Sequence, residues 1–76
     1  MTTLNQVSLG QLGVVRNLRQ GEVSVRLMEL GLLPEVQVRP LFRAPFGDPV
    51  AVEVDAAYVV SLRLEEAALI EVDIQA

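Results

Sequence analysis

The chain has 76 residues with no cysteine or histidine, so we expect one small domain, residues 1–76, without disulfides, thiolate chemistry or the usual soft-metal ligands. Ten acidic residues against six arginines give a net charge of −4, which excludes the clustered positive charge that binds nucleic acid or anionic lipid. The 51% hydrophobic composition predicts a dense core and a tendency to self-associate, so a homo-oligomer is one expected state.

The first quarter of the chain predicts a helical turn and a strand. Residues 4–10 can form one turn of helix, with Leu4 and Val7 on the same side and Gly10 ending it. Residues 12–19 are rich in Val and Leu and predict the first strand.

Residues 22–30 carry the clearest helical pattern. One apolar face repeats at helical spacing through Val23, Leu27 and Leu30. Glu22 lies four residues before Arg26, the order that favours an ion pair, and Gly31 fits the left-handed residue just beyond a helix end. A second apolar side consists of Val25, Met28 and Leu32.

From residue 35 the hydrophobic period changes to two, which is typical of strands. Pro40 predicts an edge or a bulge. Strands are predicted around residues 36–39, 50–54, 58–64 and 70–74, with a turn-rich loop at 44–49 and one helical turn at 65–68 that buries Ala67. The fold class is therefore mainly β: a small five-stranded SH3-like barrel with a short helix inserted between strands 1 and 2, because closure satisfies edge backbone groups.

No segment has the character of a signal peptide or a membrane helix. No basic residue precedes Arg16, and the apolar stretches are only a few residues long, whereas a membrane helix needs about 20. We therefore expect a cytoplasmic protein that does not insert into a membrane.

Four blocks of the sequence resemble the FeoA family, the ferrous iron transport protein A family. They are Arg26-Leu27-Met28-Glu29-Leu30-Gly31-Leu32-Leu33-Pro34, Ala44-Pro45-Phe46-Gly47-Asp48-Pro49, Ser61-Leu62-Arg63 with Glu66-Ala67, and Ile70-Glu71-Val72. Leu4, Val7 and Gly10 are similar to the family's opening pattern, and the resemblance spans essentially the whole chain.

Three positions depart from the family pattern. Glu35 replaces the usual glycine after Pro34, and Pro40 stands where a β-branched residue is usual. The connection at residues 55–58 is one residue longer than the family's, so we expect a different tip between the third and fourth predicted strands.

The resemblance implies a cytoplasmic SH3-like accessory module that contacts the cytoplasmic part of the ferrous iron transporter FeoB and supports or regulates uptake. It also implies an alternative. The same domain occurs at the C-terminus of DtxR-type metal-dependent repressors, so the chain could be a detached homo-oligomeric or sensory module of such a regulator. The chain is too short to add a helix-turn-helix.

Candidate partner-binding residues lie on the second apolar side of the helix and in the loop at 44–49. Met28 and Leu32 form a docking patch if they are exposed, or pack under the N-terminal turn if they are not. Phe46 either contacts a partner or closes the barrel as a core plug. Asp48 is included in the partner surface, with hydrogen bonding to neighbouring turn amides as its alternative.

Enzymatic and metal-binding functions find little support. Without histidine or cysteine, the ligands available to a metal are carboxylates, carbonyls and water, which suit weak sites for hard ions. Glu53 with Asp55, and Glu71 with Asp73, are same-face pairs that could hold an ion loosely, but the interpretation we favour is an acidic solvated face. Arg63 with Glu65 and Glu66 predicts another solvated cluster. We assign no catalytic, cofactor or metal residue and predict that the chain is not an enzyme.

Overall fold

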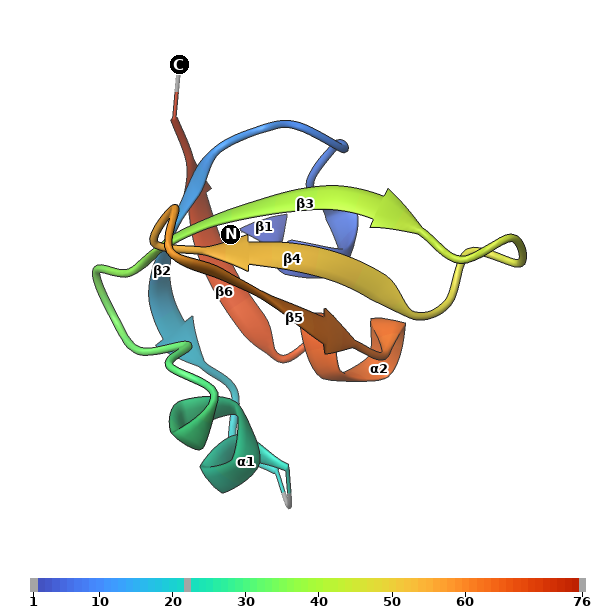
Figure 1. Cartoon of the computed structure of the whole chain (residues 1–76). Coiled ribbons are helices and arrows are strands. Elements are labelled where there is room, and N and C mark those ends of the chain that lie inside the picture. The colour runs from blue at the N-terminus through green and yellow to red at the C-terminus, as the bar shows by residue number, and fades with distance from the viewer. Residues whose placement is uncertain (1, 22, 76) are drawn as a thin grey trace.

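The computed structural model describes residues 2–21 and 23–75. Six strands form one antiparallel sheet in the order β1-β6-β2-β3-β4-β5, curved around a single core (Figure 1). In chain order the elements are β1 (Thr2–Thr3), the 3-10 helix η1 (Leu4–Gln6), β2 (Gly13–Leu18), α1 (Ser24–Glu29), β3 (Gln37–Arg43), β4 (Val50–Val54), β5 (Tyr58–Leu62), α2 (Leu64–Ala67) and β6 (Ile70–Ile74).

The mainly β prediction with a helix between the first two long strands is confirmed, but the strand count of five was wrong. The additional strand β1 pairs with Val72 and Glu71 of β6. Two residues are too few to show an alternating pattern, so only the pairing identifies them as a strand. Within the described residues, β1 and β5 are the ends of the strand order and do not pair with each other.

The predicted N-terminal helical turn is present. Leu4 and Val7 are both buried, as expected from their spacing, and the Thr3 amide donates to Gln6 Oε1 at 3.2 Å. The turn ends at Gln6 rather than at Gly10. Gly10 instead adopts a φ of 83° in the following turn, where its amide donates to the Pro40 carbonyl at 2.6 Å.

Helix α1 (Ser24–Glu29) lies within the predicted residues 22–30, and the chain reverses at Gly31, as the glycine predicted. The amide of Gly31 donates to the carbonyl of Met28 at 2.9 Å, and that of Leu32 donates to the carbonyl of Leu27 at 3.1 Å. Together with a Gly31 φ of 92°, these two bonds form a Schellman C-cap. The expected pair of Glu22 with Arg26 lies outside the described residues.

The alternating strands supply most of the core. Pro40 pairs with Val52 and Phe42 with Ala51, so the predicted bulge is confirmed at this point of β3. Ile74, which the alternation places in the core, is exposed at the end of β6. The buried hydrophobic residues are Leu4, Val7, Val15, Leu27, Leu32, Val38, Val50, Val52, Val54, Leu62, Ala67, Ile70 and Val72.

Two of the departures from the family pattern fall at residues with positive φ angles. Glu35 has a φ of 76°, the region that favours the glycine usual there. Asp55 and Ala56 have φ angles of 56° and 57°, and the Ala57 amide donates to the Val54 carbonyl at 2.9 Å. This left-handed turn absorbs the extra residue between β4 and β5.

Candidate protein-interaction surface

The loop between β3 and β4 holds its aromatic side chain fully in solvent. Phe46 is 100% exposed, so the core-plug alternative is wrong. The loop is nevertheless well braced, because the Gly47 amide donates to the Ala44 carbonyl at 2.7 Å and the Ala44 amide donates to the Pro49 carbonyl at 3.0 Å. A braced loop presents Phe46 at a lower ordering cost on binding than a flexible one.

Asp48 braces the same loop from its other end. Its Oδ1 accepts a hydrogen bond from the Leu64 amide at 3.1 Å, at the start of α2. The expected alternative, bonds to neighbouring turn amides, does not describe this contact, because Leu64 is 16 residues away in the chain. Asp48 is exposed, so it positions the loop and also borders the surface around Phe46.

The second apolar side of α1 is only partly a surface. Val25 and Met28 are exposed, but Leu32 has 0% exposure, so its expected place in a docking patch was wrong. The reason is the Schellman cap at Gly31, which turns Leu32 back toward the helix axis and buries it, as hydrophobic residues at this position commonly are. The helical spacing that grouped Leu32 with Met28 does not apply beyond the helix end.

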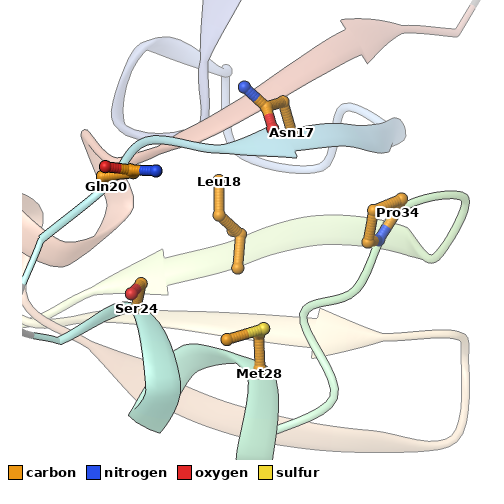
Figure 2. Close-up of a pocket in the computed structure, with 6 residues that line it drawn as sticks. All are labelled: Asn17, Leu18, Gln20, Ser24, Met28 and Pro34. Carbon is orange, nitrogen blue, oxygen red and sulfur yellow. The ribbon is translucent and has the colours of Figure 1, made fainter.

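A shallow groove of about 320 Å³ runs between β2 and α1. Figure 2 shows Leu18 of β2 and Met28 of α1 pointing toward each other across it, with Gln20 and Ser24 at one end and Pro34 at the other. The described residues that line it have uncharged side chains; they are Asn17, Leu18, Gln20, Ser24, Met28 and Pro34. This part of the lining suits an uncharged or apolar side chain of a partner.

The predicted partner residues therefore separate into two surfaces. The Phe46 loop lies at one end of the sheet and α1 lies at the opposite end, below β2 (Figure 1). Sequence reasoning missed Leu18, because a residue of a predicted strand was expected in the core, whereas it is only partly buried beside Met28.

Helix α1 is held in place by two polar contacts. Arg26 Nη1 donates to Glu66 Oε2 in α2, and the Tyr58 hydroxyl of β5 donates to the Leu30 carbonyl at 2.7 Å. Glu66 is only 8% exposed and also accepts from the Arg63 amide at 2.9 Å. The expected solvated cluster around Arg63 was therefore wrong for Glu66. Its buried carboxylate in α2 accepts the hydrogen bond from Arg26 of α1 and so connects the two helices.

The acidic pair on β6 is occupied by arginines. Arg16 Nε lies 2.6 Å from Asp73 Oδ2, and Arg16 Nη1 lies 2.8 Å from Glu35 Oε1. Hydrogen bonding to Asp73, and then to Glu35, raises the pKa of Arg16. Arg19 Nε lies 3.0 Å from Glu71 Oε2. The hydrogen bond from Arg19, followed by one from Asn17, lowers the pKa of Glu71.

The ion pairs of Arg16 and Arg19 with the carboxylates of β6 oppose metal binding there. Glu71 and Asp73 each face a guanidinium, which competes with a cation for the same oxygens. In the turn after β4, Asp55 Oδ1 accepts a bond from the Gln37 amide at 3.3 Å. Across residues 2–21 and 23–75, no three acidic side chains gather as metal ligands would. In the same ranges, no helix is both long and apolar enough to span a membrane.

Solved structures of known proteins resemble the fold of this chain. The chain is similar to the FeoA protein of Chlorobium tepidum, at 32% identity and a TM-score of 0.88, covering 99% of this chain and 71% of that one. It is also similar to a zinc complex of FeoA from Stenotrophomonas maltophilia, described as a prokaryotic SH3-domain protein, at 29% identity and a TM-score of 0.83, covering 96% and 91%. No curated protein matches significantly in sequence.

A manganese-dependent transcriptional repressor shares the fold. It is 21% identical with a TM-score of 0.88, over 97% of this chain and 36% of the repressor. The FeoA domain family, in contrast, matches in sequence over residues 2–74, which include the Phe46 loop and helices α1 and α2. The chain therefore belongs to the FeoA family, which is linked to ferrous iron transport, and has that family's SH3-like fold.

Proposed function

We propose that the chain is a non-enzymatic cytoplasmic accessory protein that binds the cytoplasmic part of a FeoB-type ferrous iron transporter. The family supports a role in ferrous iron transport, and the S. maltophilia relative is described as a candidate activating factor for that transport. In this proposal iron is the transporter's cargo, and the carboxylates of β6 face arginines.

One observation carries the proposal: Phe46 is a fully exposed aromatic on a braced loop. An aromatic side chain buries a large area at low entropic cost and is a frequent anchor of protein interfaces. Keeping it in water has no benefit for folding, which points to a partner pocket that receives it. Asp48 fixes the loop against α2, and the groove beside Met28 offers a second, separate contact.

The test is capture of FeoB by the tagged protein from native extract that includes solubilised membranes. We expect recovery of FeoB, and a loss of about 10- to 30-fold with Phe46→Ser, the effect typical of an interface anchor. Phe42→Ser is the matched control, because Phe42 is also an exposed phenylalanine but lies on β3 itself, outside the loop. Met28→Ser tests the groove independently.

Each outcome separates the proposed function from its alternative. FeoB recovered equally with Phe46→Ser and wild type would remove the loop from the interface. Recovery of a soluble DNA-binding regulator in place of FeoB would overturn the accessory role and favour the detached regulatory module, for which the shared fold with a manganese-dependent repressor is the supporting observation.

A further inference from the structure

The segment that carries α1, residues 23–34, has no main-chain to main-chain hydrogen bond to the sheet within the described residues. Its main-chain bonds, including those of the helix and its Schellman cap, stay within residues 21–36. On either side the chain is anchored again, because the Arg19 amide donates to the Leu69 carbonyl at 2.7 Å and the Glu35 amide donates to the Val15 carbonyl at 2.8 Å. Side chains must therefore hold this segment, which we call the α1 flap.

The apolar hold on the α1 flap is small. Leu27 and Leu32 have no exposed area, and across residues 2–21 and 23–75 they are the only flap residues in the fully buried core. Most of that core comes from the strands. A helix of six residues is also far shorter than the about 12–15 residues that an isolated helix needs in water. If both leucines leave the core, the helix loses its support while the sheet keeps most of its own.

The polar ties of the α1 flap lie on the side of β5 and α2. Tyr58 is the first residue of β5, and its hydroxyl donates to the Leu30 carbonyl at 2.7 Å. Arg26 donates to Glu66 of α2, the helix that follows β5 in the chain. These two contacts connect the flap to one neighbour of the sheet edge and to the edge strand itself.

On its other side, toward β2, the α1 flap forms one wall of the groove. Met28 and Pro34 of the flap lie across the groove from Leu18 and Gln20 (Figure 2). In the part of the chain that the structure describes, no hydrogen bond links residues 23–34 to β2. The segment is therefore tied at β5 and α2 and untied at β2, so an outward movement of the flap widens the groove.

We propose that the α1 flap opens as one unit while the sheet stays folded, with Tyr58 as its latch. Opening breaks one tyrosine hydrogen bond and one ion pair and exposes two leucines, Leu27 and Leu32. Global unfolding breaks these contacts and the whole sheet, so the opened state is populated far more than the unfolded state. The opened groove accepts a larger apolar group than a single side chain.

The test is native-state hydrogen exchange of the full chain, followed by NMR. The reporters are the amides of Leu27, Leu30, Gly31 and Leu32, since each donates to a carbonyl within the flap. We expect these four amides to have similar protection factors. Those factors should lie at least about 10-fold below the protection factors of β4, which pairs with a strand on both sides.

A variant in the loop between β3 and β4 distinguishes flap opening from global unfolding. Gly47 has a φ of 88°, and nothing lies within 4 Å of a Cβ at this position, so Gly47→Ala strains the folded loop without touching the flap. Global unfolding relieves this strain, but flap opening does not. Gly47→Ala should therefore speed the exchange of the β4 amides at least about 5-fold and leave the four flap amides unchanged.

A second variant tests the latch. Tyr58→Phe removes the bond to the Leu30 carbonyl and should speed the exchange of all four flap amides about 5-fold. The diagnostic amide is that of Leu27, whose own bond is to the Val23 carbonyl, about one turn away from Leu30. The β4 amides should accelerate by the same factor, because global unfolding breaks the tyrosine bond as well.

Flap amides that are as protected as those of β4, or that Gly47→Ala accelerates together with them, would overturn the proposal, because the flap would then unfold only with the sheet. Acceleration by Tyr58→Phe confined to Leu30 and Gly31 would show fraying of the helix end instead of one opening unit. No acceleration at all would exclude Tyr58 as the latch. The exchange is measured on this chain alone, so capture of FeoB can succeed or fail independently of this result.

Discussion

Replacing Gly31 with alanine tests how the end of α1 is joined to β5. Gly31 has a φ of 92°, where an L-residue costs about 1–2 kcal/mol. A Cβ there would also lie 2.0 Å from the Tyr58 hydroxyl, which is held by its bond to the Leu30 carbonyl at 2.7 Å. The ring must swing away and lose that bond, a further cost of about 1 kcal/mol. Gly31→Ala should therefore lower the free energy of unfolding by about 2–3 kcal/mol.

Two comparisons isolate the steric part of this cost. Gly47→Ala also sits at positive φ, at 88°, but has nothing within 4 Å of a built Cβ, so it should show only the backbone cost. In a Tyr58→Phe background, Gly31→Ala should cost about 1 kcal/mol less than in wild type, because the bond to Leu30 is already absent. The Tyr58 ring carbon Cζ lies 3.4 Å from the built Cβ and can stay in place.

The assay is urea unfolding followed by far-UV circular dichroism. Fluorescence is unsuitable because the chain has no tryptophan and Tyr58 is its one tyrosine. With a slope of about 1 kcal/mol per M for a domain of this size, a 1 kcal/mol difference moves the midpoint by about 1 M. Equal costs of Gly31→Ala in the wild-type and Tyr58→Phe backgrounds would refute the coupling between α1 and β5.

Two further predictions concern the hydrophobic core and the fall of the unfolding free energy at low pH. Leu27→Ala and Val52→Ala remove side chains with no exposed area, and each should cost about 2–4 kcal/mol, seen as a large drop in the melting temperature; an unchanged melt would contradict the core assignment. Glu71 has a pKa lowered by Arg19, so its contribution to stability is complete above its ordinary value of 4.5 and is lost as pH falls through the lowered pKa. Arg19→Gln should therefore make the unfolding free energy fall less between pH 7 and pH 3, and an unchanged pH dependence would contradict this pairing.

Several features of the fold could be predicted because they depend on local chemistry. The alternation of Val50, Val52 and Val54 places them on one face of a strand, and all three are buried. A glycine after an apolar helical pattern predicts a left-handed helix end, and Gly31 provides it. The four sequence blocks identified the family for the same reason, since each is a local pattern in a defined order.

The candidate surface depended more on tertiary structure. Periodicity shows which residues share a face, but not whether another part of the chain covers that face. Nothing local distinguishes Phe46 in solvent from Phe46 in the core, or the buried Glu66 from its exposed neighbour Glu65. Leu32 is the exception, because the Schellman pattern around Gly31 carries a local signal for its burial.

The sequence by itself determined the class of fold, the family and the absence of histidine and cysteine chemistry, because composition and short-range spacing act through local propensity. Tertiary structure alone decided that β1 joins β6, that Asp48 contacts the start of α2 and that, within residues 2–21 and 23–75, β5 pairs with β4 and with no other strand. Each of these is a contact, or an open edge, between segments far apart in the chain. Their energies depend on how the whole sheet curves, which no short window of sequence contains.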